Sequence, residues 1–120
     1  MGRYHYHTDE DEKNIVRSMI RLDDKRKRGK IDRTETAFDK KIAAAIEAAE
    51  EEIELPTEAG RPRDLLLEKI RQNIIHGTSY ERIGEVYVGR EAFYKYVRRY
   101  QRLVGIHVGI YTDKKKRRGV

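Results

Sequence analysis

Apolar residues recur at helical spacing in two long stretches of the first half of this 120-residue chain. From about Glu10 to Leu22 they follow an i, i+1, i+4, i+5 pattern, and from about Thr34 to Leu55 they form a single stripe. The apolar positions are Ile15, Val16, Met19, Ile20 and Leu22 in the first stretch, and Phe38, Ile42, Ala45, Ile46, Ala49 and Ile53 in the second. Because an α-helix completes a turn every 3.6 residues, both patterns predict amphipathic helices with one buried face.

The charge block DDKRKRGK between the two stretches ends at Gly29 and predicts a loop. The stripe of the second helix is short for a coiled-coil seam, which favours a place in the core of its own domain over a dimer interface. The C-terminal half of this helix is acidic, which opposes the helix dipole, so we expect a basic neighbour or tertiary packing to compensate. The carboxylates concerned are Glu47, Glu50, Glu51, Glu52 and Glu54.

The strongest break in the pattern is the segment LPTEAGRPR, in which two prolines and a glycine cluster. We place a boundary there, between an N-terminal helical region for packing or oligomerisation (residues 1–58) and a second region (residues 59–111). Residues 112–120 form a basic tail. Directly after the break, apolar spacing predicts a helix from about Arg63 to Ile75, ended by Gly77 in a left-handed conformation.

Two more helices are predicted after this one. Thr78 and Glu81 stand in the T-x-x-E relation of a capping box, so a short helix should begin at Ser79, with Gly84 where a neighbouring helix comes close. A Val-Gly pair then breaks the pattern, and a longer helix follows from about Arg90 to Val104. The fold class predicted is all-α, a small helical domain with a C-terminal helix-turn-helix. The segment from Ile106 to Tyr111 is left open between a strand and a packed tail.

On a helical wheel the longer helix has a core face and a charged face. Its core positions are Phe93, Val97, Tyr100 and Val104, flanked by Tyr96 and Leu103. The opposite face carries Glu91, Tyr94, Lys95, Arg98, Arg99 and Arg102. We expect Tyr96 and Tyr100 to pack inside and Tyr94 to point outward among the cations.

Charge is distributed unevenly along the chain, whose net charge is +6. Residues 32–58 hold three Lys and Arg against nine Asp and Glu, a balance of −6, whereas residues 59–120 hold fifteen against six, a balance of +9. Such asymmetry indicates a module that binds a polyanion. The absence of cysteine excludes disulfides and thiolate metal sites. The N-terminus lacks the apolar run of a signal peptide, and no segment has the length of a membrane span, so a cytoplasmic protein is expected.

A helix-turn-helix with a basic second helix predicts binding of that helix in the major groove of double-stranded DNA. The residues near its N-terminus, Arg90, Glu91, Tyr94 and Lys95, are the candidates for base edges. Arg98 and Arg102 are candidates for phosphate contacts, and Arg99 belongs to the same DNA-binding face. The tail residues Lys114, Lys115, Lys116, Arg117 and Arg118 are expected to form an arm on nearby phosphates.

From about Leu66 to Ile106 the chain resembles the helix-turn-helix of phage transcriptional regulators of the ArpU/RinA type, which are similar to the promoter-binding C-terminal region of sigma factors. The segments that carry the resemblance are GTSYERIGEVY and VGREAFYKYVRRYQRLVGI. Gly89 stands where the family usually has the Ser that caps the recognition helix. The resemblance implies a phage or prophage regulator of transcription, with RNA polymerase as a further candidate partner.

Other classes of function have weaker support. A DNA-packaging recognition subunit of the small-terminase kind also uses a helix-turn-helix, and a protein-interaction adaptor could present the same basic face to an acidic partner. Self-association through the N-terminal region is left open. His5 and His7 alternate near acids, but they form no shaped metal site, and no catalytic constellation or cofactor motif is present. We therefore expect no enzyme activity and no cofactor.

Overall fold

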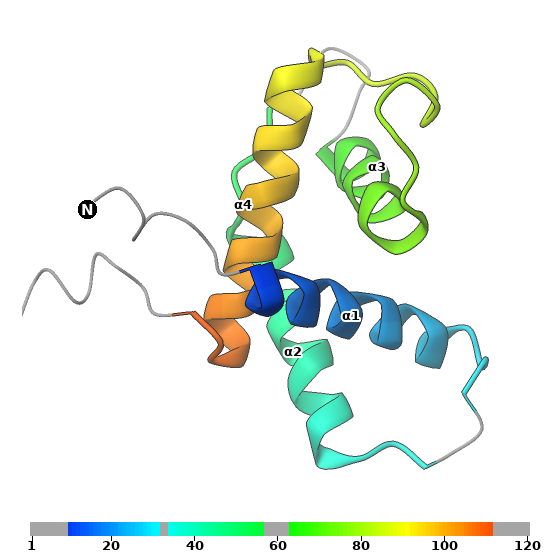
Figure 1. The fold of residues 1–120 in the computed structure, drawn as a ribbon, viewed down its shortest axis with the longest axis vertical. Helices are drawn as coiled ribbons and strands as arrows, with labels where there is room; N and C mark the ends of the chain where they lie inside the picture. Colours follow the sequence, from blue (N-terminus) through cyan, green and yellow to red (C-terminus); the bar gives the residue numbers. More distant parts are fainter. Residues whose placement is uncertain (1–9, 32–33, 57–62, 112–120) are drawn as a thin grey trace, which may run out of the picture.

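The computed structural model describes residues 10–31, 34–56 and 63–111. Within these residues the chain forms four α-helices and no strand (Figure 1). They are α1 (Glu10–Lys27), α2 (Ala37–Glu52), α3 (Arg63–His76) and α4 (Arg90–Val108). The predicted all-α class is therefore confirmed. No helix in the described part has the length and apolar character needed to cross a membrane.

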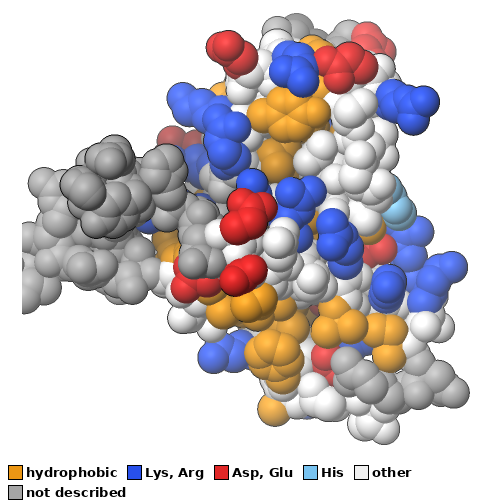
Figure 2. Space-filling model, in the orientation of Figure 1, with side chains coloured by type: hydrophobic (Ala, Val, Ile, Leu, Met, Phe, Trp, Pro, Cys, Tyr) orange, Lys and Arg blue, Asp and Glu red, His pale blue; other side chains and the backbone are white. Residues whose placement is uncertain are grey.

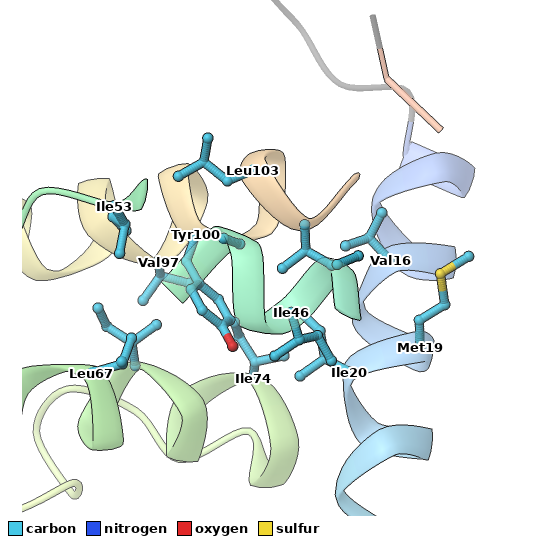
Figure 3. Packing of buried hydrophobic residues seen from close by; sticks show 14 of the residues in the cluster. Val16, Met19, Ile20, Ile46, Ile53, Leu67, Ile74, Val97, Tyr100 and Leu103 are labelled. Carbon is cyan, nitrogen blue, oxygen red and sulfur yellow. The ribbon is translucent and has the colours of Figure 1, made fainter. Parts of the chain in front are cut away.

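One hydrophobic core joins all four helices (Figure 3). α4 makes its most extensive contact with α2, and α1 lies against α2, α3 and α4. Phe93 and Tyr100 of α4 are the largest fully buried side chains. Helices from both sides of the boundary predicted after residue 58 contribute to this core, whereas the boundary itself falls in residues 57–62, outside the described residues.

α1 is longer than its apolar pattern predicts. It was expected to end near Leu22, but it continues through the basic run to Lys27, so the expectation of a loop there is wrong. Pairing of charges one turn apart stabilises the extension, because Asp23 binds Lys27 at 3.0 Å and Asp24 binds Arg28 at 3.0 Å. Lys and Arg in the last turn also complement the helix dipole. The charge block therefore belongs to the helix from Asp23 to Lys27, and only its last three residues lie beyond the helix.

The first turn of α2 precedes its first buried apolar residue, Ile42. Its capping box is complete, since the Asp39 backbone N–H donates to the Thr36 hydroxyl and the Thr36 N–H donates to the Asp39 carboxylate. Phe38, predicted to lie in the core stripe, is 53% exposed because this first turn extends past the other helices (Figure 1). The stripe is buried from Ile42 onward. Ile15 of α1 is likewise 45% exposed and does not join the core.

The acidic end of α2 has the basic neighbours that its sequence requires. Arg63 donates to the carbonyl oxygens of Glu50 and Ile53, the latter at 2.8 Å. Arg71 donates to both carboxylate oxygens of Glu50 at 2.8 Å, and the His107 ring lies 2.7 Å from the Glu52 carboxylate. The expectation of a compensating basic neighbour is confirmed: Arg63 and Arg71 come from α3, and His107 comes from α4.

The prediction of a short helix from Ser79 is wrong. Residues 77–89 contain no helix and only one turn, in which the Arg82 N–H donates to the Ser79 carbonyl at 3.0 Å. Gly84 has a φ of +99°, which ends any helix started at Ser79 after a single turn. No neighbouring helix requires this glycine; the atom nearest to a Cβ at this position would be the Lys69 Nζ, at 3.3 Å. The predicted helix-turn-helix is accordingly not confirmed.

α4 continues past the predicted end at Val104 to Val108. Gly109 then adopts the left-handed conformation with a φ of +98°, and the N–H groups of Ile110 and Tyr111 return to the Gly105 carbonyl at 2.8 and 3.1 Å. This is a hydrogen-bonded helix stop of the kind that favours glycine. The segment that the sequence left open is therefore the last turn of α4 and its cap, with no strand.

Candidate nucleic-acid interface

α4 has the two faces that its sequence predicts. Phe93, Val97, Tyr100 and Val104 are buried, which confirms the core face. Lys95, Arg98, Arg99 and Glu91 are exposed on the other side, and Arg102 is partly exposed. Figure 1 shows the N-terminal half of α4 flanked on one side by α3 and residues 77–89, with no described helix on its other side. The exposed cations of this half are therefore not covered by a described helix.

The cations on this outer surface are not neutralised by neighbours. In the described part of the chain, no Asp or Glu forms an ion pair with Lys95, Arg98, Arg99 or Arg102. Figure 2 shows Lys and Arg side chains gathered along one flank of the upper half of the molecule, where Figure 1 draws α4. The basic end of α1 differs, because Asp23 and Asp24 bind Arg26, Lys27 and Arg28 there. The α4 surface therefore presents a local excess of positive charge.

Tyr94 makes more contacts within the protein than the sequence predicts. It is half-buried, and its hydroxyl accepts a hydrogen bond of 3.0 Å from the Tyr80 backbone N–H. Its ring meets the Phe93 ring edge-on, with centroids 5.3 Å apart. The expectation that Tyr94 simply points outward is thus wrong, since the segment before α4 folds back against it. It still borders the basic surface.

Arg90 is held in place by two contacts. Its Nε donates to Oε2 of Glu81 at 2.7 Å, and its Cζ lies 5.2 Å from the centre of the Tyr94 ring. The Glu81 carboxylate is bonded to its own backbone N–H and to Arg90, and these bonds lower its pKa. The bond to Glu81 in turn raises the pKa of the Arg90 guanidinium. A charged, oriented guanidinium results at the first residue of α4.

Residues 77–89 take the place of the missing helix in supporting the start of α4. The Tyr80 hydroxyl donates to the Val88 carbonyl at 2.8 Å, and its ring lies 5.6 Å from that of Phe93. Ile83 is buried, and its carbonyl accepts from the Lys69 Nζ at 3.1 Å. Tyr80 lies in the segment for which the sequence predicts a short helix. The signal that could have revealed its role is the hydroxyl itself, because a buried tyrosine needs a polar partner.

A second polar cluster supports the inner face of α4. The Tyr100 hydroxyl donates to Glu50 at 2.7 Å, on the same carboxylate that binds Arg71. Burial raises the pKa of Glu50, but the hydrogen bonds from Arg71 and Tyr100 and the charge of Arg71 outweigh it, so the net pKa is lowered. Burial and the Glu50 charge raise the pKa of the Tyr100 hydroxyl. α2, α3 and α4 are therefore joined at one charged, satisfied junction.

The structure brings together the four residues predicted to read base edges. Arg90, Glu91, Tyr94 and Lys95 line one shallow depression, together with Ala92 and Arg98. Arg99 and Arg102 lie outside its lining. The predicted arm, Lys114 to Arg118, and the His5 and His7 pair fall outside the described residues. Among the residues that the structure describes, no cluster of His, Asp or Glu is arranged to hold a metal ion.

Comparisons of the chain with protein-family models, with curated proteins and with solved structures found no match. A function for the α4 surface is therefore inferred from its geometry and charge.

Proposed function

We propose that the protein is a cytoplasmic, sequence-specific DNA-binding regulator of transcription that places the outer face of α4 in the major groove. The observation that carries the proposal is the row of α4 cations that have no acidic partner in the described part of the chain, beside the oriented Arg90. An α-helix with its side chains is about 10–12 Å across, and the major groove of B-DNA is about 12 Å wide. Lys95, Arg98 and Arg99 are exposed on this face, so they are accessible to the phosphates of a duplex.

The roles of the residues follow from their positions. Arg98 and Arg99 lack carboxylate partners within the described chain and are exposed, which suits phosphate oxygens. Arg90, Glu91, Tyr94 and Lys95 lie near the helix N-terminus, the part of a recognition helix that usually meets base edges. The arm from Lys114 to Arg118 would add phosphate contacts. The phage or prophage origin and contact with RNA polymerase rest on the resemblance to ArpU/RinA-type regulators alone.

A charge reversal tests this proposal. Arg98→Glu combined with Arg99→Glu should weaken binding to random-sequence duplex at least about tenfold at low salt, because two phosphate contacts become repulsive. The slope of the logarithm of the affinity against the logarithm of salt concentration should fall by about 2. Electrophoretic mobility shift over a salt series measures both quantities.

The matched control is Lys40→Glu with Lys41→Glu, which changes the net charge equally on exposed residues of α2. This variant should bind as the wild type does, apart from a small general effect of net charge. If the two variants weaken binding equally, or if the wild type binds no duplex, DNA binding through α4 is wrong. Affinity for an acidic protein in place of DNA would then favour the adaptor.

A further inference from the structure

Arg90 has a different environment from the other Lys and Arg residues of the α4 surface, because Glu81 and Tyr94 lie against it. Among the Lys and Arg residues of α4, and counting only partners that the structure describes, Arg90 alone has a carboxylate partner, at 2.7 Å, and an aromatic ring beneath its guanidinium. Both side chains of the ion pair are largely exposed, 61% for Arg90 and 58% for Glu81. An exposed pair of this kind adds little to stability, because solvent screens it and ordering two long side chains costs entropy. Its place at the start of α4 therefore suggests a role in recognition.

The Glu81 bond selects which edge of the guanidinium remains available. Glu81 takes the Nε, and in the described part of the chain neither Nη atom of Arg90 has a hydrogen-bond partner. The two Nη groups form a planar fork that donates two parallel hydrogen bonds. Guanine presents the matching pair of acceptors, O6 and N7, in the major groove.

Charge decides between a base and a phosphate as the target of this fork. Glu81 already neutralises Arg90, and a phosphate bound there would stand close to the Glu81 carboxylate. A guanine edge is neutral and meets no such repulsion. Among the described residues, Lys95, Arg98 and Arg99 form no ion pair with a carboxylate, so their charges remain available to phosphates.

We propose that Arg90 reads a guanine in the major groove and that Glu81 is its positioning residue, holding the guanidinium by its Nε so that both Nη groups face the base. This inference rests on the proposed binding of duplex DNA by α4. The Tyr94 ring supports the guanidinium from below, and residues 77–89 hold both Glu81 and Tyr94 in place through Tyr80. The segment that replaces the predicted helix thereby takes part in specificity.

Selection of bound sequences from a pool of random duplexes tests the role of Arg90. The wild type should select a site with a guanine at one position, and Arg90→Ala should lose the preference at that position while keeping the others. Replacing this guanine by 7-deazaguanine, which lacks the N7 acceptor, should weaken wild-type binding between about 5- and 150-fold. It should leave the affinity of Arg90→Ala unchanged. Arg99→Ala, the matched control, should weaken all sequences alike and keep the guanine.

The positioning role of Glu81 needs a separate readout. Glu81→Ala should reduce the guanine preference without moving it to another position, and Glu81→Gln, which keeps an acceptor oxygen, should restore most of it. A purely structural role for Glu81 would change the melting temperature and leave the base preference as it is. Circular dichroism confirms that each variant is folded.

Three outcomes overturn the inference. If Arg90→Ala keeps every base preference, Arg90 does not read guanine; if it weakens all sequences uniformly, Arg90 binds phosphate. If Glu81→Ala keeps the full guanine preference, Glu81 does not position Arg90. In these cases binding that still depends on Arg98 and Arg99 leaves the proposed function intact. A wild type that binds no duplex overturns both.

Discussion

The side chain of Tyr100 has two roles. Its ring fills part of the core, and its hydroxyl binds a charged carboxylate. The ring is fully buried between α2 and α4, and the hydroxyl reaches Glu50, which Arg71 also binds. The helical wheel predicts that Tyr100 points inward. It cannot predict Glu50 and Arg71 as partners, because these residues lie on α2 and α3, far away in the sequence, and only the packing of the helices brings them together.

Tyr100→Phe should lower the free energy of unfolding at neutral pH by about 1.5–3 kcal/mol, since the hydroxyl donates to a charged acceptor. Tyr96→Phe, a half-buried control on the same helix, should change it by less than about 0.5 kcal/mol. Because the folded pKa of Glu50 lies below its ordinary value of 4.5, the stability due to its charge is present above that value and lost as the pH falls below it. The Tyr100→Phe deficit should therefore shrink in acid. Urea unfolding at pH 7 and at several acid pH values measures it, and a deficit independent of pH would contradict this account.

At the scale of elements, local sequence rules predict most helices but misplace several ends. α3 ends within one residue of its predicted end, because Gly77 provides a left-handed stop with a φ of +69°. The capping box at Thr78 predicts a helix that does not form, since Gly84 breaks it after one turn and tertiary bonds from Lys69 and Tyr94 fix the segment instead. α1 is longer than predicted because charge pairs continue the helix after its apolar residues end.

Substitution by serine should have opposite effects on stability at Gly84 and at Gly89. Gly84→Ser should lower the free energy of unfolding by about 1–2 kcal/mol, because its φ of +99° is unfavourable for any residue with a Cβ. Gly89→Ser should raise it by a few tenths of a kcal/mol: Gly89 is the N-cap of α4, has an extended conformation, and makes no side-chain capping bond. A Cβ at Gly89 would meet no atom within 4 Å. Thermal unfolding of the two variants measures the signs, and a stabilised Gly84→Ser would show that the turn tolerates a side chain.

At the scale of the whole molecule, the balance of +9 in residues 59–120 predicts a basic surface, and α4 presents one. What composition cannot predict is which cations are neutralised. Arg26, Lys27 and Arg28, at the end of α1, are paired with Asp23 and Asp24, whereas Lys95, Arg98 and Arg99 have no acidic partner among the described residues. The charge pattern along α4 is thus enough to predict the candidate surface. The orientation of Arg90 cannot be predicted in this way, because it depends on the fold of residues 77–89.

A shared core predicts that the described helices unfold together. Ile42→Ala, at a fully buried position of α2, should lower the free energy of unfolding by about 2–5 kcal/mol and shift a single transition. Phe38→Ala, one turn earlier and half exposed, should change it far less. Far-ultraviolet circular dichroism and tyrosine fluorescence, which reports mainly on the tyrosines of residues 80–111, should give coincident transitions. Two separate transitions would mean that the regions on either side of residue 58 fold independently.

One side of α4 packs in the core and the other is exposed, and this division affects how the binding preference of the protein can evolve. Lys95, Arg98 and Arg99 are exposed and form no ion pair within the described residues, so substitutions there can create new targets at little cost in folding. Position 90 is different, because its neighbour Glu81 lies in another segment of the chain. A new side chain there would need a matching change at 81, and we expect these two positions to vary together among descendants of this protein.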